Sequence, residues 1–186
     1  MKGPASVEGD ERLRLFLALL LPPATLDAIV SWQGEALAGV RGVRVVPREN
    51  LHLTMAFLGH RPAAELEPIV GALREAAGGE AARLSLRGYR ETRSVGMLTF
   101  DYEDGRAAAL AADLHARLEA LGVYEPERRR WLPHVTVARF RERPRLQPAL
   151  PELEPFVLSD AAAYLSRLRP GGAQYEVLES MRVGGR

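Results

Sequence analysis

The fold of this chain is decided by two short stretches of one pattern, His52-Leu53-Thr54-Met55 and His134-Val135-Thr136-Val137. Each lies in a predicted β-strand, at residues 51–58 and 134–140. Side chains alternate between the two faces of a strand, so each histidine shares a face with its threonine, while the apolar residues point to the opposite face. The sequence therefore predicts two rigid platforms, each with an imidazole beside a hydroxyl, and we expect the functional site where they meet.

Hydrophobic periodicity and the positions of proline and glycine predict the elements around these strands. Three helices are expected: one opened by Pro22-Pro23, one ending at about Ala77, and one capped by Asp104 and ending at Gly122. Further strands are predicted at 12–21, 43–46, 82–86 and 96–102, and a closing β-hairpin at 156–168 and 173–183. Loops are predicted at 59–62, 90–94 and 125–130, and an irregular segment at 141–155.

The order of these elements repeats. The first half reads strand, helix, His-x-Thr strand, helix, strand, and the second half begins with strand, helix, His-x-Thr strand. A duplicated unit of roughly 80 residues would place the two motifs at equivalent positions, one in each lobe. We therefore expect two related lobes that bring the histidines to opposite sides of a shared groove.

Composition predicts one globular domain with no general attraction to nucleic acid. Hydrophobic residues make up 47% of the 186 residues and the net charge is +1, so affinity for phosphate must come from a local cluster of charges. The chain has no cysteine, which removes disulfides, thiolate metal sites and thiol catalysis. We expect a flexible tail at residues 1–11 and a single bilobal domain at 12–186.

The apolar run at residues 15–21 (LFLALLL) is interpreted as a buried strand and not as a targeting segment. Acidic as well as basic residues precede it, and Pro22-Pro23 follows it without a small-residue cleavage site. It is also too short to cross a bilayer as a helix. We therefore expect a cytoplasmic protein that does not associate with a membrane.

Paired imidazoles suit displacement at phosphorus. One can act as general base toward an attacking water while the other, as general acid, protonates the leaving oxygen. Thr54 and Thr136 could donate hydrogen bonds to the phosphate oxygens, and no metal is needed if enough donors surround the anion. Arg139 could add a positive charge, but strict alternation puts it on the face opposite His134. A bulge or the end of the strand must therefore turn Arg139 inward.

The same residues allow other interpretations. A metal site lacks a clear third ligand and any metal-ligand spacing, and one His-x-Thr alone would mostly be chance. His60 and His115 are interpreted as solvated bystanders. The basic run at 128–130, flanked by Tyr124 and Trp131, is either a solvated loop or a segment that holds an RNA backbone and stacks a base.

Paired tetrads of this kind, here HLTM and HVTV, resemble the signature of the 2H phosphoesterases, and are most similar to the RNA 2′,3′-cyclic phosphodiesterases once called 2′-5′ RNA ligases. The resemblance covers residues 12–183. Four stretches carry it: RLFLALLLPP, RGVRVVPRENLHLTMAFLG, RRRWLPHVTVAR and YLSRLRPGGAQYEVLES.

The resemblance implies an α+β fold of two antiparallel sheets around a central cleft, with helices outside. It implies metal-independent hydrolysis of a terminal RNA 2′,3′-cyclic phosphate to a 2′-phosphate, with no cofactor. His52 would be the proton donor to the leaving 3′ oxygen and His134 the proton acceptor, while Thr54, Thr136 and Arg139 would bind the phosphate. The expected partner is RNA with a 2′,3′-cyclic phosphate or a 2′-5′ linkage, with no obligate protein partner. Candidate RNA contacts are Arg130, Trp131 and Tyr164.

Three other functions stay open at this point. An ATP-dependent RNA ligase needs a nucleophilic lysine, and the only lysine is Lys2 in the predicted tail. The reverse reaction, an ATP-independent 2′-5′ ligation, needs no lysine. A non-catalytic RNA- or nucleotide-binding module would retain a phosphate pocket without the chemistry.

Overall fold

A computed structural model describes residues 12–102, 104–127, 130–170 and 172–184. The predicted tail at 1–11 lies outside these residues. The helices are α1 (Pro23–Ala36), α2 (Leu66–Ala77) and α3 (Arg106–Ala120), with short 3₁₀ turns at Arg48–Asn50 and Ala63–Glu65. The strands are β1 (Arg12–Leu20), β2 (Val43–Val45), β3 (Leu53–Pro62), β4 (Arg83–Glu91), β5 (Val95–Tyr102), β6 (His134–Phe140), β7 (Phe156–Val157), β8 (Asp160–Arg169) and β9 (Gly172–Arg182).

The strands form two antiparallel sheets that meet at one residue pair. The strand order is β7-β4-β5-β6-β3-β1-β8-β9, with β2 on the free part of the β6 edge. Between β3 and β6 the register contains a single pair, Leu53 opposite Val135. We call β3-β1-β8-β9 the first sheet and β7-β4-β5-β6, with β2, the second sheet. The expected α+β fold of two sheets with outer helices is thereby confirmed.

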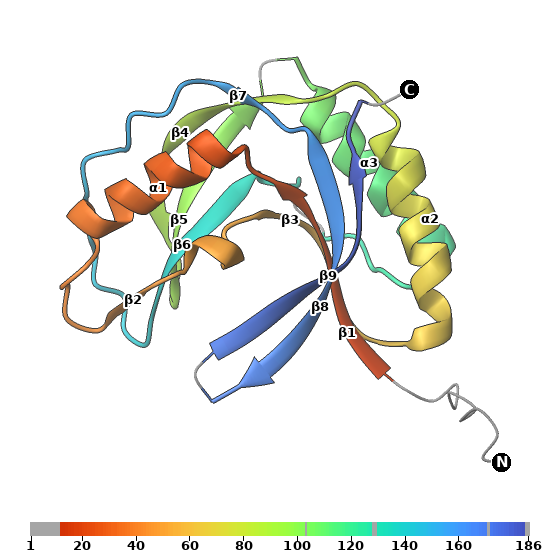
Figure 1. The fold of residues 1–186 in the computed structure, drawn as a ribbon, viewed down its shortest axis with the longest axis horizontal. Coiled ribbons are helices and arrows are strands. Elements are labelled where there is room, and N and C mark those ends of the chain that lie inside the picture. Colours follow the sequence, from red (N-terminus) through yellow and green to blue (C-terminus); the bar gives the residue numbers. More distant parts are fainter. Residues whose placement is uncertain (1–11, 103, 128–129, 171, 185–186) are drawn as a thin grey trace, which may run out of the picture.

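The helices cover the sheets crosswise. Helix α1 follows β1 of the first sheet in the chain but lies over the second sheet, where Trp32 contacts Tyr89 of β4 (Figure 1). Helices α2 and α3 pack together; α2 contacts β8 and β9 of the first sheet, and α3 also contacts β4 and β5 (Figure 1). The order β1-α1-β3 recurs as β5-α3-β6, which confirms the duplicated unit.

The core lies between the sheets and these helices. Leu15, Leu17 and Leu19 alternate along β1, and each is at most 1% exposed. Leu53 and Val135, the apolar residues of the two His-x-Thr motifs, are fully buried. Each motif is thus anchored from behind by its apolar residue, as the alternation predicted.

Several predicted boundaries are wrong where strand pairing overrides local signals. The expected loop at 59–62 continues β3, which pairs with β1 as far as Pro62 and accommodates its glycine with a bulge at Leu58. Strand β4 runs on to Glu91 because β5 pairs with it that far. The hairpin begins at Asp160, since Phe156–Val157 is a separate strand on the β4 edge. The irregular segment at 141–155 and the β6 bounds are as predicted.

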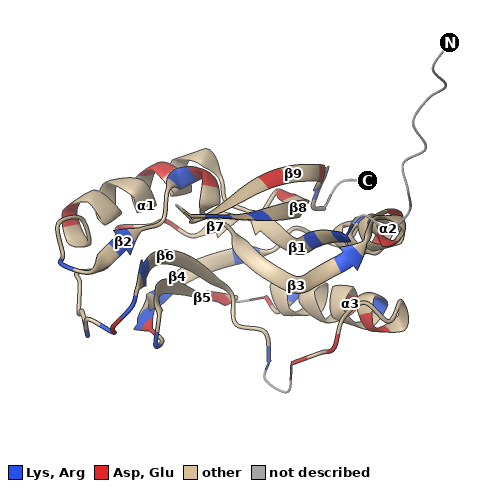
Figure 2. Ribbon diagram, turned by 90° about the horizontal axis from the view of Figure 1, so that it is seen from below, with Lys and Arg blue, Asp and Glu red and all other residues tan. Residues whose placement is uncertain are grey.

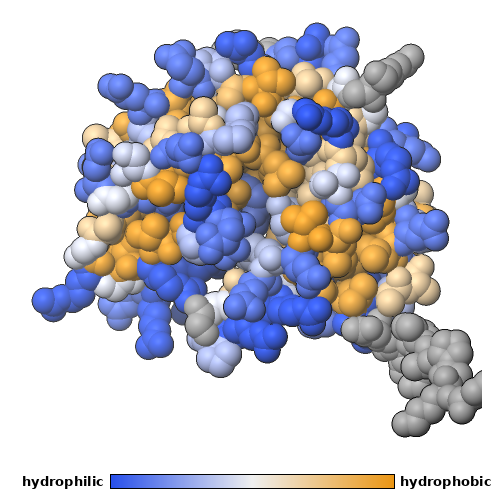
Figure 3. All heavy atoms as spheres, in the orientation of Figure 1, coloured by the Kyte–Doolittle hydropathy of each residue, from blue (hydrophilic) through white to orange (hydrophobic). Residues whose placement is uncertain are grey.

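The surface carries both signs of charge. Basic and acidic segments are interspersed over the helices and strands (Figure 2), in keeping with a net charge of +1. Hydrophilic side chains surround separate apolar patches on the face seen in Figure 3. None of the helices in the described ranges is long and apolar enough to span a membrane.

Candidate functional site

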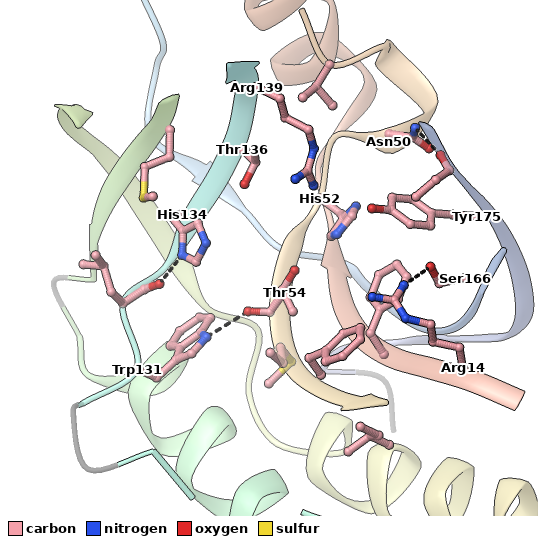
Figure 4. A pocket seen from close by; sticks show the side chains of 18 of the residues that line it. Arg14, Asn50, His52, Thr54, Trp131, His134, Thr136, Arg139, Ser166 and Tyr175 are labelled. Atoms are coloured by element: carbon pink, nitrogen blue, oxygen red, sulfur yellow. Dashed lines mark hydrogen bonds between the residues drawn. The ribbon is translucent and has the colours of Figure 1, made fainter. Parts of the chain in front are cut away.

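The single pair that joins the sheets also assembles the site. Leu53 and Val135 are opposed in an antiparallel pair, so one step to either side His52 lies opposite Thr136 and Thr54 opposite His134. Opposed residues point to the same face, which puts all four polar side chains on one side of the junction. They line a common cavity of about 1580 Å³ between the two sheets (Figure 4).

His52 lies against aromatic rings of the first sheet. Its ring centroid is 4.9 Å from that of Phe16, 5.8 Å from that of Tyr164 and 5.5 Å from that of Tyr175. Burial among these rings lowers the pKa of His52 from 6.5 to about 4. A hydrogen bond to the Asn50 backbone opposes this shift, and electrostatic interactions with His134 and Arg139 add to it. In the free protein His52 is therefore neutral at pH 7.

His134 is held in one tautomer. Its Nδ1 lies 2.8 Å from the carbonyl oxygen of Leu132, two residues earlier in the chain (Figure 4). Because a carbonyl only accepts, Nδ1 carries the hydrogen and Nε2 of the neutral ring keeps its lone pair. His52 likewise bonds the backbone two residues before it, at Asn50, so the two histidines are held in equivalent ways.

A bulge in β6 brings Arg139 to the cavity. Met97 of β5 pairs with Thr136, and Gly96, the residue before Met97, pairs with Ala138. Val137 is therefore the extra residue. Val137 and Ala138 are both buried, after which Arg139 is exposed on the same side as Thr136 (Figure 4). The sequence required such an irregularity for Arg139 to face inward, and the bulge supplies it.

Strand β3 has the matching bulge. Ala18 of β1 pairs with Thr54 and Leu17 with Ala56, so Met55 is the extra residue. Phe57, which is 50% exposed, then faces the cavity at the position that corresponds to Arg139. Sequence reasoning missed this residue, although the six-residue stretches HLTMAF and HVTVAR also share an alanine at the fifth position.

A helix side chain holds each bulge. The buried amide of Gln33 on α1 donates to the carbonyl oxygens of Val137, at 2.8 Å, and Val46, at 3.0 Å. His115 on α3 lies with Nε2 2.8 Å from the carbonyl oxygen of Met55. The interpretation of His115 as a solvated bystander is therefore wrong: it is half-buried, packs on Tyr124 and lines the cavity. The helical periodicity around His115 does not predict a partner on β3.

The remaining candidate residues are spread more widely. Trp131 is half-buried and donates to the Thr54 carbonyl at 3.0 Å, and Arg130 lines the cavity with its guanidinium 3.4 Å from the Tyr102 hydroxyl. Tyr164 is only 6% exposed and stacks behind Phe16, so it offers little surface to RNA, whereas Tyr175 does line the cavity. His60 is exposed on β3, and Arg128-Arg129 lie outside the described residues.

The cavity concentrates positive charge in an almost neutral molecule. Among its described lining residues are seven arginines and three glutamates. In the same part of the chain no group of three or more His, Asp or Glu side chains is arranged to hold a metal ion. The arrangement therefore suits an anion held by hydroxyl and guanidinium donors between two imidazoles.

Two antiparallel sheets that meet at a doubled His-x-Thr motif define a protein of the 2H phosphoesterase class. The chain belongs to the 2′-5′ RNA ligase superfamily, whose model matches residues 21–169.

Individual relatives agree with this family. The chain is 34% identical over 183 residues to a Thermus thermophilus protein named RNA 2′,3′-cyclic phosphodiesterase, covering 93% of this chain and 91% of the relative. A crystal structure of TT0787 from Thermus thermophilus matches with a TM-score of 0.80 and 33% identity, over 93% and 99% of the two chains. Escherichia coli LigT complexed with 3′-AMP matches with a TM-score of 0.75 and 25% identity, over 94% and 100%.

Proposed function

We propose that this protein hydrolyses terminal 2′,3′-cyclic phosphates of RNA to 2′-phosphates. Three relatives over most of the chain are named RNA 2′,3′-cyclic phosphodiesterases, which supports this substrate. The single observation that carries the proposal is the diagonal arrangement of two histidines and two threonines about the Leu53–Val135 pair. Such an arrangement can hold one phosphate between an acid and a base.

In the proposed reaction His134 is the proton acceptor. Nε2 of its neutral ring takes a proton from a water molecule as the water oxygen attacks phosphorus. The bond from phosphorus to the 3′ oxygen breaks, and His52 gives its proton to that oxygen. The products are a 2′-phosphate and a 3′-hydroxyl, and proton exchange with solvent restores both histidines.

The low pKa of His52 means that the substrate must help to charge it. A neutral His52 cannot donate a proton to the leaving oxygen, and the nearby positive charge of Arg139 is one reason for its neutrality. A phosphate anion bound between these groups offsets that charge and raises the pKa of His52. His52 would thus be protonated mainly in the complex, where the proton is used.

Thr54, Thr136 and Arg139 would carry the charge of the phosphate. Their hydroxyl and guanidinium groups face the same cavity and are suited to donate to the non-bridging oxygens. With these donors the proposed reaction needs no metal ion. Hydrolysis should therefore continue at an unchanged rate in the presence of a chelator.

The same groups could also join two RNA fragments. If a 5′ hydroxyl takes the place of water, His134 accepts its proton as its oxygen attacks phosphorus, the bond from phosphorus to the 3′ oxygen breaks with protonation by His52, and a 2′-5′ linkage forms without ATP. The description of the family as 2′-5′ RNA ligases is the observation that favours this second activity. Sealing of RNA fragments at high concentration, followed by cleavage on dilution, would test it.

The hydrolysis is tested with an oligonucleotide that ends in a 2′,3′-cyclic phosphate. We expect a 2′-phosphate product, and a loss of about 10²- to 10⁴-fold in kcat for His52→Ala and for His134→Ala. Arg74→Gln, on the outer helix α2, is the matched control and should keep full activity. Circular dichroism confirms that each variant is folded. Near-normal turnover by either histidine variant would contradict the mechanism, and binding without turnover by the wild type would indicate a non-catalytic module.

A further inference from the structure

The two ends of the cavity differ although the duplicated units place equivalent residues there. Arg139 faces the cavity at one end, and Phe57, at the corresponding position of the other unit, faces it at the other end. The duplication thus provides one guanidinium on β6 and an aromatic ring on β3. At the end with the ring, a positive charge has to come from residues of other strands.

Arg14 of β1 brings a guanidinium to the Phe57 end. Its guanidinium carbon lies 4.6 Å from the centre of the Phe57 ring. A cation at this distance is attracted by the negative face of the ring. Arg14 also donates to the Ser166 hydroxyl of β8 at 2.5 Å (Figure 4). Both ends of the cavity therefore present an arginine, although the two arginines come from unrelated positions of the duplicated unit.

The surroundings of Arg14 favour an anion as its ligand. Among the described residues Arg14 forms no ion pair with a carboxylate, so its charge is not neutralised by the protein. Ser166 is only 4% exposed, and because its oxygen accepts from Arg14 its own hydroxyl hydrogen is left to donate. The stack on Phe57 and the bond to Ser166 fix the guanidinium before any ligand arrives, which reduces the entropy lost on binding.

We propose that Arg14, Ser166 and Phe57 form a second anion subsite, which binds the phosphodiester on the 5′ side of the terminal nucleotide. This inference rests on the proposed function. Phe57 follows Thr54 by three residues, roughly 7 to 10 Å along β3 at about 3.3 Å per residue. One ribose with its ester links spans such a distance. With the cyclic phosphate between the histidines, the 5′ phosphate of the same nucleotide reaches Arg14.

The consequence is a preference for RNA ends over free nucleosides. A nucleoside 2′,3′-cyclic phosphate fills only the site between the histidines, whereas a 5′-phosphorylated nucleotide or an oligonucleotide fills both sites. A charge-assisted hydrogen bond of this kind is expected to raise kcat/KM by about 10- to 100-fold. The protein would then act on the ends of RNA chains.

The test compares two substrates within each variant. The ratio of kcat/KM for a 5′-phosphorylated nucleoside 2′,3′-cyclic phosphate to that for the unphosphorylated compound is measured for the wild type, Arg14→Gln and Arg14→Lys. We expect a ratio of about 10 or more in the wild type, close to 1 in Arg14→Gln and intermediate in Arg14→Lys. Because it is a ratio, any general loss of activity cancels. Arg74→Gln should keep the wild-type ratio.

The outcomes separate the subsite from the proposed function. Turnover of the unphosphorylated nucleoside by the wild type tests the proposed function alone. A wild-type ratio near 1, or a high ratio that survives in Arg14→Gln, would overturn the subsite while leaving that function intact. If Arg14→Gln does not fold, Ser166→Ala replaces it and should also lower the ratio; a ratio equal to that of the wild type would again overturn the proposal.

Discussion

His52 and His134 occupy equivalent positions of a duplicated unit but have different surroundings. His52 is packed among the rings of Phe16, Tyr164 and Tyr175, and its pKa falls to about 4. The His134 ring is fixed through Nδ1 by a carbonyl group. Two equivalent imidazoles can take on different proton-transfer roles when their environments separate them in this way. The roles that we propose follow this difference.

The low pKa of His52 leads to a prediction about pH–rate profiles. The profile of kcat/KM reports the free protein, in which His52 titrates at about pH 4, so we expect a limb near that pH. The profile of kcat reports the complex, in which the phosphate charge raises the pKa of His52 and moves the same limb to higher pH. A cyclic phosphate diester stays singly negative over this range and adds no limb of its own. Coincident limbs in the two profiles would show that substrate does not charge His52.

Two strand bulges determine what the site contains beyond the tetrads. Without the extra residue Val137, Arg139 would point into the core, and without Met55 so would Phe57. The first of these bulges could be anticipated, because alternation alone left Arg139 on the wrong face. The second could not, since Phe57 was not suspected of facing the cavity and an apolar residue in a strand is ordinarily assigned to the core.

The side chains that bond the carbonyl groups of the two bulges could not be predicted either. Gln33 lies on α1 and bonds Val137, while His115 lies on α3 and bonds Met55, so each helix holds the bulge of the other unit. These contacts join residues 104 and 60 positions apart in the chain. Helical periodicity identifies the buried side of a helix, but it carries no information about which strand that side meets.

Replacing Gln33 tests whether the bulge in β6 affects activity, because Gln33 does not line the cavity. Gln33→Leu leaves the Val46 carbonyl buried without its amide donor and removes one of two donors to Val137. We expect a loss of about 1–3 kcal/mol of stability, seen as a Tm lower by several degrees. We also expect a fall in kcat/KM, because the bulge that positions Arg139 loosens.

A double-mutant cycle distinguishes positioning from general destabilisation. If Gln33 acts through Arg139, Gln33→Leu should reduce kcat/KM much less in an Arg139→Ala background than in the wild type. Additive losses would mean that the two residues act independently. Ser31→Ala, an exposed change on the same helix, is the control and should alter neither Tm nor activity.

At the scale of the whole molecule, the duplication was readable from the sequence because the order of elements and the tetrads repeat. The crosswise placement of the helices and the junction at one residue pair were not, because both depend on packing between lobes. The charge distribution was predictable only in outline. A net charge of +1 excluded a generally basic surface, and the arginines that the fold gathers around the cavity come from strands far apart in sequence.

This local charge leads to a prediction about salt. Salt screens the attraction between a bound phosphate and nearby arginines, so a second phosphate contact makes kcat/KM fall more steeply with salt concentration. We therefore expect the slope of log kcat/KM against log salt concentration to be steeper for a 5′-phosphorylated nucleoside 2′,3′-cyclic phosphate than for the unphosphorylated compound. Arg14→Gln should bring the second slope back to the first, because it removes the second phosphate contact. Equal slopes for the two substrates in the wild type would mean that a single phosphate is bound and that the remaining arginines only raise the general potential of the cavity.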